Sequence, residues 1–106
     1  MITCLKGNLI QKSPTFIVLD VGGVGYYLHI SMNTFENLPL LDKELFIYSE
    51  MIVREDSITL YGFHSESERQ LFRLLISVSG IGPKSGIGIL SGISLSDFKS
   101  AILTAN

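Results

Sequence analysis

The sequence predicts a small β-structure followed by an all-α part, and three observations lead to this prediction. The first 63 residues contain apolar runs rich in β-branched and aromatic side chains, with glycine and acidic turn signals between them. From about residue 64 onward, the apolar residues recur at helical spacing. Hydrophobic residues make up 46% of the 106 residues and charged residues 17%, which is typical of a globular chain.

About five strands are expected in the β-part. Short apolar runs lie on both sides of Gly7, and residues 33–38 fit one helical turn. A five-stranded barrel with a short helix between its third and fourth strands has the layout of an OB-fold, although the periodicity alone also fits other small barrels and sandwiches. The strand candidates after the first cover residues 15–21, 25–31, 44–54 and 57–63.

The first helix of the all-α part is expected to begin at Ser65. Ser65 and Glu68 have the spacing of a capping box, in which each side chain bonds the backbone N–H of the other residue. Gly80 is expected to end this helix, because glycine readily adopts the left-handed conformation that follows many helices. The apolar stripe of the helix consists of Leu71, Phe72, Leu75 and Ile76.

Two further helices are expected beyond this glycine. Pro83 suits the first position of a helix, because the N–H that proline lacks would have no partner there. Ile87 and Leu90 would form the inner face of this helix, and Gly92 would end it. Ser94 and Asp97 would open a third helix. Its inward side chains would be Leu95, Phe98, Ala101 and Ile102.

The charge distribution limits how this chain can bind nucleic acid. Residues 1–63 carry four Lys/Arg and seven Asp/Glu, whereas residues 64–106 carry four Lys/Arg and three Asp/Glu. A protein that holds phosphates by charge alone is usually much more basic. Any binding of DNA is therefore expected to depend on backbone donors and on shape, with the mildly basic helical part as the place for it.

No signal in the sequence indicates a membrane, a metal or a reaction. The apolar runs are too short to cross a bilayer, and the first residues lack the order of a signal peptide, so we expect a cytoplasmic protein. Cys4 is the only cysteine and is expected to be a small core residue of the first strand. His29 and His64 lack partners for a metal or catalytic site, and no cofactor is expected.

The stretch "SGIGPKS" allows three interpretations. A dinucleotide loop would need a strand before it and a distant acidic residue, and a Walker loop fails because Lys84 follows Pro83. A plain turn between helices would need Gly80 and Gly82 only for their backbone conformation. In a helix-hairpin-helix motif, the N–H groups of the turn and the next helix N-terminus would hold a phosphate without reading its sequence.

Four stretches of the sequence, taken together, resemble one protein family. "MITCLKGNLI", "VGGVGYYLHI", "VREDSITLYGF" and "ERQLFRLLISVSGIGPKSGIGILSG" resemble, in this order, the first two domains of the RuvA family of bacterial Holliday junction branch migration subunits. The resemblance covers nearly the whole chain. It implies an OB-fold domain over residues 1–63, with oligomerisation and an acidic pin, and an incomplete helix-hairpin-helix DNA-binding domain over residues 64–106.

The resemblance also implies roles for individual residues. It places Glu55 and Asp56 in a pin at the centre of a homotetramer, whereas the residues alone would suggest a solvated turn. Arg54 would either hold a phosphate beside the pin or pair with Glu55, and both alternatives stay open. The DNA-binding hairpin would be formed by Gly80, Ile81, Gly82, Lys84 and Ser85.

The function implied is structure-specific and sequence-independent binding of four-way junction DNA in recombination and DNA repair. The family subunit is not an enzyme, since ATP hydrolysis belongs to the partner RuvB, and the RuvC resolvase is a further partner. The family's second hairpin and its RuvB-binding third domain would follow Asn106, so this piece is expected to bind junctions more weakly than a complete subunit. Gly86 and Gly88 stand where the family tends to have alanine, at a cost of about 1 kcal/mol each.

Three other functions remain as alternatives. An OB-fold protein for single strands would prefer unpaired DNA, a nucleotide-dependent oxidoreductase would bind NAD, and an oligomerisation module would ignore DNA. Four aromatic residues of the β-part would allow base stacking. For most of them we expect packing in the barrel core or between subunits instead. These residues are Tyr26, Tyr27, Phe46 and Tyr48.

Overall fold

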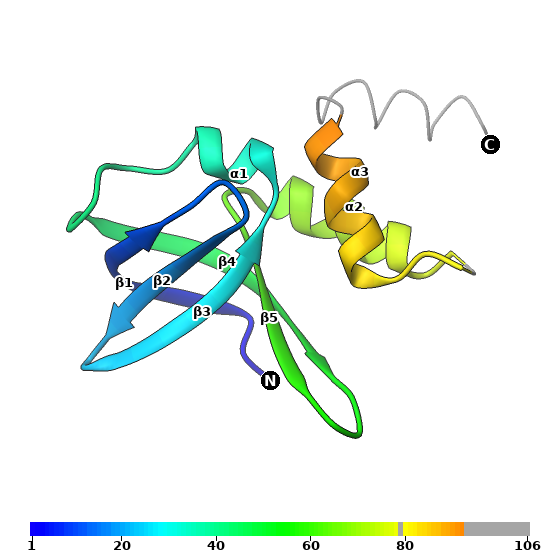
Figure 1. Cartoon of the computed structure of the whole chain (residues 1–106), viewed down its shortest axis with the longest axis horizontal. Coiled ribbons are helices and arrows are strands. Elements are labelled where there is room, and N and C mark those ends of the chain that lie inside the picture. Colours follow the sequence, from blue (N-terminus) through cyan, green and yellow to red (C-terminus); the bar gives the residue numbers. More distant parts are fainter. Residues whose placement is uncertain (79, 93–106) are drawn as a thin grey trace.

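The computed structural model describes residues 1–78 and 80–92 and shows a closed five-stranded barrel with helices on one side (Figure 1). The strands are β1 (Cys4–Lys12), β2 (Phe16–Val21), β3 (Val24–Ile30), β4 (Glu44–Val53) and β5 (Ile58–Phe63). The helices are α1 (Met32–Glu36), α2 (Glu66–Ile76) and α3 (Pro83–Gly92). The predicted helix from Ser94 onward lies outside the described residues.

The strand order confirms the OB-fold prediction. Around the barrel the order is β1-β2-β3-β5-β4, and β4 pairs with β1 to close it. All pairs are antiparallel except β3 with β5, which run parallel, with Leu28 opposite Leu60. The short helix α1 follows β3, as the sequence predicts, and Ser31 caps it by accepting a hydrogen bond from the Thr34 N–H.

The first strand continues through Gly7 and does not divide there. Its first half pairs with β4 and its second half with β2, so β1 must bend between two neighbours. A Cβ atom at Gly7 would overlap the carbonyl oxygen of Asp20 and lie 2.8 Å from the Val21 side chain. Glycine at position 7 therefore allows the two strands to approach each other, and it does not mark the end of a strand.

The barrel interior is filled by aliphatic side chains that alternate along the strands. The members of this barrel core are Leu9, Ile17, Leu19, Leu28, Ile30 and Ile47, and none is more than 2% exposed. Cys4 lies in β1 but is exposed, so the prediction that it belongs to the core is wrong. Its register partner is Tyr48, which points out of the barrel, and Cys4 therefore shares that outer face.

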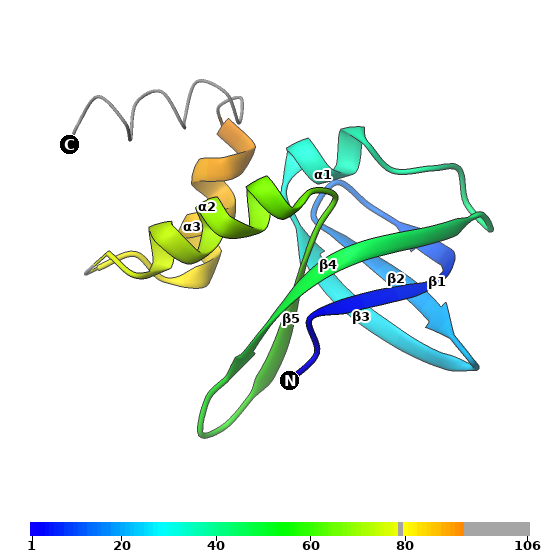
Figure 2. The same cartoon turned by 180° about the vertical axis from the view of Figure 1, so that it is seen from behind.

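The helices share a second core with the outer face of β5. In Figure 2 α2 begins beside the end of β5 and extends away from the barrel, with α3 behind it. Gly86 of α3 faces α2, and a Cβ atom there would be in ordinary contact with Ile76 and Phe72. The buried members of this shared core are Tyr61, Phe63, Leu71, Phe72, Leu75 and Leu90, which includes most of the predicted helical stripe.

The start of α2 departs from the predicted capping box in one respect. Ser65 caps the helix by accepting from the Glu68 N–H, as predicted. The Glu68 carboxylate, however, is fully buried and accepts from the hydroxyls of Ser31 at 2.8 Å and of Thr34. This carboxylate therefore joins α2 to the start of α1. The ring nitrogen of His64 lies 3.7 Å from the same carboxylate.

The end of α2 is also earlier than predicted. The helix ends at Ile76 with Ser77 as its cap, and the Ser77 hydroxyl bonds the carbonyl of Leu74. Gly80 lies in the following turn with a φ of 88°, a left-handed conformation that favours glycine. Pro83 begins α3, as predicted. No helix within residues 1–78 and 80–92 is long and apolar enough to cross a lipid bilayer.

Candidate nucleic-acid interface

Two segments distant in the sequence face each other across a groove of about 430 Å³. One is the β-hairpin formed by β4 and β5, which projects away from the barrel in Figure 1, and the other is the N-terminus of α3. We call this concavity the β-hairpin groove. It is lined by Ile52, Arg54, Ser57, Thr59 and Tyr61 from the strands and by Gly82, Pro83, Lys84 and Ser85 from the helix.

The groove carries two cations, Arg54 on one wall and Lys84 on the other. Neither takes part in the ion pairs formed among the described residues, whereas Arg69 and Arg73 are paired with glutamates. The predicted alternative in which Arg54 pairs with Glu55 is therefore not what the structure shows. Both charges also act on nearby aromatic rings, as the following pKa shifts indicate.

Each of the two cations affects the pKa of one nearby ring, Tyr61 in the groove and His29 outside it. Burial raises the pKa of Tyr61, and the charge of Arg54 opposes that increase. Burial and, to a smaller extent, the charge of Lys84 lower the pKa of His29. Arg54 therefore acts on a ring of β5 and Lys84 on a ring of β3, although burial is the larger cause of both shifts.

The N-terminus of α3 offers backbone donors to the groove. The Gly82 carbonyl accepts from the Gly86 N–H at 2.9 Å, which makes the first turn of the helix. The N–H groups of Lys84 and Ser85 fall in that turn, where helix geometry provides no intrahelical acceptor. These donors and the positive end of the helix dipole favour an anion at this place.

Gly80 and Gly82 of the turn differ in whether the structure requires glycine there. Gly80 is required by its left-handed φ. Gly82 has no such φ, and a Cβ atom there would meet no atom within 4 Å in the described part of the chain. Neither backbone conformation nor packing within the described chain therefore requires glycine at position 82, and its bare backbone faces the groove.

Ile81 does not fit the role of a donor. Its N–H donates to the Val78 carbonyl at 3.2 Å, and its side chain packs against the shared core. Ile81 and Gly80 do not line the groove, and the prediction that they contact DNA stays a prediction. The residues that the structure brings together from the predicted set are Arg54, Gly82, Lys84 and Ser85.

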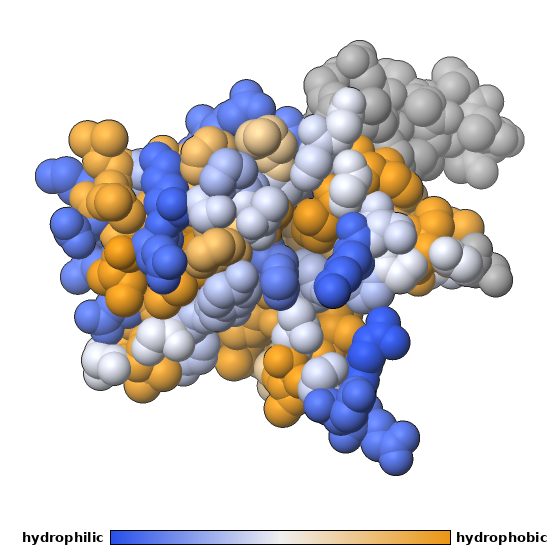
Figure 3. Space-filling model, viewed as in Figure 1, coloured by the Kyte–Doolittle hydropathy of each residue, from blue (hydrophilic) through white to orange (hydrophobic). Residues whose placement is uncertain are grey.

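Glu55 and Asp56 lie beyond the groove at the tip of the β-hairpin. The turn is closed by a bond from the Arg54 N–H to the Ser57 carbonyl at 2.8 Å, and both carboxylates are exposed. Figure 3 shows this projecting tip as a hydrophilic end. Arg54 and both acidic residues line a shallow concavity at this tip, so the acidic side chains lie beside one of the two cations of the groove.

Sequence reasoning missed four residues on the strand side of the groove, which are Ile52, Ser57, Thr59 and Tyr61. Ser57, Thr59 and Tyr61 occupy alternate positions and form the wall that faces α3. The alternation along β5 is visible in the sequence and would have placed them on one face. What the sequence does not show is that α3 lies over that face.

The fold and this groove define an OB-fold protein with cations beside a helix N-terminus, an arrangement typical of proteins that bind nucleic acid. Comparison with known proteins identifies the family. Residues 1–62 match the family described as the RuvA N terminal domain, and the chain belongs to that family.

The similar proteins include several curated relatives with one name. The chain is 47% identical over 106 residues to the "Holliday junction branch migration complex subunit RuvA" of Coxiella burnetii strain Dugway 5J108-111, covering 100% of the chain and 53% of that relative. Its namesake from Serratia proteamaculans strain 568 is 45% identical over 102 residues, which cover 96% of the chain and 50% of the relative. The chain thus spans about half the length of these relatives.

Proposed function

We propose that this chain is the DNA-binding part of a RuvA subunit and binds four-way junction DNA by its structure, without reading the base sequence. In this proposal the β-hairpin groove holds the phosphate backbone of one junction arm. The N–H groups of Lys84 and Ser85 and the charges of Lys84 and Arg54 contact the phosphates. The names of the relatives and the family membership support this function.

The observation that carries the proposal is the glycine at position 82. A glycine that neither packing nor φ requires leaves the helix N-terminus open to a close approach by another molecule. A phosphate oxygen is the group that such an N-terminus accepts best. Because the donors are mostly backbone amides, they contact the DNA backbone and carry no base specificity.

The acidic pin is given a separate role. In a homotetramer the carboxylates of Glu55 and Asp56 would gather at the crossover of the junction. Like charge repels phosphate, and at physiological salt the repulsion is screened beyond about 8 Å. The pin would therefore act only at contact range, to separate strands and direct them into neighbouring arms.

The proposed protein does no bond chemistry itself. It would hold the junction open for the RuvB motor, which would hydrolyse ATP during recombination and DNA repair, with RuvC as a further partner. The proposed division of labour assigns oligomerisation to residues 1–63 and most of the DNA contacts to residues 64–106, with Arg54 as the contact from the first domain. The proposed location is the cytoplasm.

A gel-shift comparison tests the proposal. The chain is titrated, in EDTA, against a four-way junction and against a linear duplex built from the same sequences. We expect clear preference for the junction, and equal affinity for the two would contradict the proposal. Glu55→Gln combined with Asp56→Asn should change strand separation, read by fluorescent bases at the crossover, more than it changes affinity.

Two variants localise the contact to the groove. Lys84→Ala should weaken junction binding about tenfold and reduce its salt dependence by about one phosphate contact. Gly82→Ala should weaken binding more than it lowers the unfolding midpoint, because its Cβ atom would meet no described atom within 4 Å but would stand between the helix N-terminus and a phosphate. Lys43→Ala, at an exposed lysine far from the groove, is the matched control and should leave binding unchanged.

A further inference from the structure

Four rings form a strip on the outer face of the barrel, and Tyr61 alone among them also lines the β-hairpin groove. Phe16 and Tyr27 stack with centroids 4.7 Å apart, Tyr27 meets His29 at 5.2 Å, and His29 meets Tyr61 at 5.4 Å. We call these four residues the aromatic strip. It crosses three strands, from β2 through β3 to β5.

Strand register places these rings outside the barrel. Phe16 lies opposite His29 across the β2–β3 pair, while the next pair, Ile17 and Leu28, points into the barrel core. Tyr27 is 49% exposed, so half of its surface is free of protein contacts. Tyr27 therefore does not pack in the barrel core, and the other expected role, packing between subunits, stays a prediction.

The strip has a fixed end and an open end. At the fixed end Tyr61 is buried and its ring packs on Phe72 at 5.1 Å. At the open end Tyr27 and Phe16 lie on the barrel surface. A platform that is rigid at one side and exposed at the other suits a planar ligand, because little side-chain entropy is lost when a ring stacks on it.

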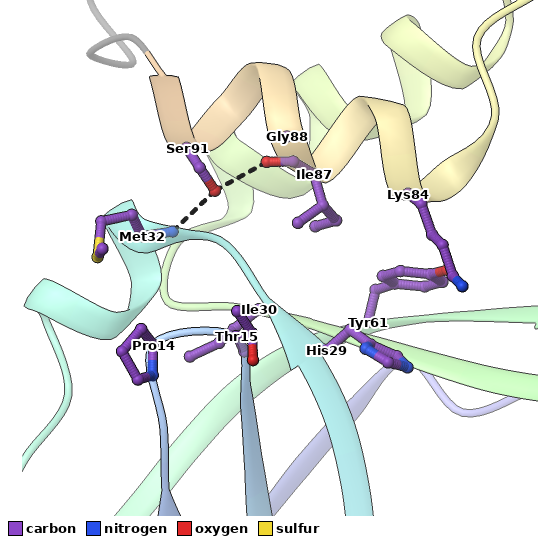
Figure 4. A pocket seen from close by; sticks show the side chains of 10 residues that line it. All are labelled: Pro14, Thr15, His29, Ile30, Met32, Tyr61, Lys84, Ile87, Gly88 and Ser91. Carbon is purple, nitrogen blue, oxygen red and sulfur yellow. Dashed lines mark hydrogen bonds between the residues drawn. The ribbon is translucent and has the colours of Figure 1, made fainter.

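The strip is continuous with the cationic groove. A second concavity of about 330 Å³ lies between β3 and α3, and Figure 4 shows Lys84 pointing toward the rings of Tyr61 and His29 at its edge. Lys84 and Tyr61 line both this concavity and the β-hairpin groove. A chain of alternating phosphates and bases could therefore contact Lys84 and the strip at the same time.

We propose that the aromatic strip binds the unpaired bases of a DNA single strand by stacking, with Lys84 beside the strand's phosphates. Proteins that hold single strands combine a cationic path with exposed aromatic rings, because every base has a face that stacks. OB-folds in general bind oligonucleotides on the face of strands 2 and 3, between the loops that follow strands 1 and 4. The strip occupies that face, between residues 13–15 and the β-hairpin.

This binding is separate from recognition of the four-way junction. It needs neither the acidic pin nor the backbone donors of α3, and it predicts affinity for a strand that has no junction. The alternative is that the same four rings only stabilise the sheet, as cross-strand side-chain pairs do, and bind no DNA. The two roles differ in whether the face of Tyr27 contacts DNA in solution.

Photocrosslinking tests the contact directly within the unaltered chain. An oligo-dT containing 5-iodouracil is bound and irradiated, and the chain is then cut with trypsin. Cleavage after Lys12, Lys43 and Arg54 puts Phe16, Tyr27 and His29 in the peptide 13–43, and puts Phe46 and Tyr48 in the peptide 44–54. We expect crosslinks on Tyr27 or its strip neighbours, and crosslinks confined to the peptide 44–54 would overturn the proposal.

A matched pair of variants tests the energetics. Tyr27→Ala should weaken binding of oligo-dT about tenfold, measured by fluorescence anisotropy, because one stacked base is lost. Phe46→Ala removes a ring of nearly equal exposure, 48%, from the outer face of β4 and should leave that binding unchanged. Tyr27→Phe keeps the ring and should retain binding. An equal loss from Tyr27→Ala and Phe46→Ala, or no loss from either, would overturn the proposal.

The same variants separate this proposal from the proposed function. Tyr27→Ala should leave the preference for a four-way junction over a linear duplex in place, because Gly82 and Lys84 are unchanged. Loss of oligo-dT binding with intact junction preference supports the strip. A different result would be that the unaltered chain shows no preference for the junction, while its binding of oligo-dT still depends on Tyr27. That result would reject the proposed function and still support the aromatic strip as a single-strand site.

Discussion

The barrel and helix α3 are built in opposite ways. The barrel encloses its own core of aliphatic side chains, and every strand has a neighbour on each side. Helix α3 is ten residues long and contains three glycines, and its one fully buried large side chain is Leu90. The barrel thus determines its own shape, whereas α3 takes its position from the elements around it.

The neighbours of α3 hold it at both sides. Gly86 faces α2, where a Cβ atom would lie 3.5 Å from the Phe72 ring, and Leu90 is buried in the core that the two helices share. At the other side the Met32 N–H donates to the Ser91 hydroxyl at 3.0 Å, and the Asn33 side chain donates to the Leu90 carbonyl at 2.7 Å. The helix whose N-terminus lines the groove is therefore positioned by α1 and α2 more than by its own sequence.

The largest effect should come from breaking the shared core that connects the two regions. Phe72→Ala removes a fully buried ring by which α2 contacts β5 and α3. We expect it to lower the free energy of unfolding by about 4 kcal/mol. Urea unfolding monitored by circular dichroism measures this. Leu74→Ala, on the exposed side of the same helix, should cost less than about 0.5 kcal/mol, and similar losses in the two variants would contradict the shared core.

A smaller loss is expected inside the barrel at Gly7. Gly7→Ala forces a methyl group against the backbone of Asp20, so β1 must move from β2, and we expect a loss of about 3 kcal/mol in unfolding free energy. Gly25→Ala is the control, because its Cβ would meet only Val18 at 3.5 Å. If Gly7→Ala is tolerated as well as Gly25→Ala, the barrel is less tightly determined than the comparison states.

The buried carboxylate between α1 and α2 should have an intermediate effect. Glu68→Gln keeps the shape but replaces a charged acceptor of two hydroxyl groups, and we expect a loss of about 2 kcal/mol. Glu66→Gln, two residues earlier, alters a partly exposed pair with Arg69 and should cost less than about 1 kcal/mol. Thermal unfolding of both variants measures the difference, and a Glu68 effect no larger than that of Glu66 would show that this link is unimportant.

The smallest effect should be a gain, and it is expected in α3. Gly88→Ala places a methyl group where no described atom lies within 4 Å and should raise stability by about 1 kcal/mol, since alanine favours the helix. Gly86→Ala should gain less, because its Cβ would already touch Ile76 at 3.4 Å. Gly80→Ala should destabilise the chain, because its φ is left-handed. Differential scanning calorimetry compares the three, and a loss for Gly88→Ala would contradict the idea that α3 is under-stabilised.

The same contrast explains what the sequence could predict. Alternation and turn residues predicted the strands and α1, because each pattern reports a local preference that the fold keeps. Pro83 predicted the start of α3 for a similar reason. Glu68 was different, since a glutamate three residues after a capping serine looks the same whether its carboxylate turns back to the cap or enters a buried cluster.

For the candidate site, the sequence predicted the residues better than their arrangement. Gly82, Lys84, Ser85 and Arg54 were named from the turn and from the family resemblance, and the structure places them on one groove. Their meeting depends on how α3 lies across β5, which is decided by packing between distant segments. The aromatic strip depends in the same way on strand register, because only the pairing of β2 with β3 brings Phe16 beside Tyr27.

The parallel pairing of β3 with β5 has a consequence for how fast the chain folds. Hairpins such as β1–β2 and β2–β3 join segments that are close in sequence, and they form on the microsecond scale. Leu28 and Leu60 pair across a loop that contains α1 and β4. Closing this longer loop costs more chain entropy than closing a hairpin, and that cost comes before the strand contacts stabilise the pair. Closure of the barrel is therefore expected to be the slow step of folding, and the helices that complete the groove can dock only once β5 is in place.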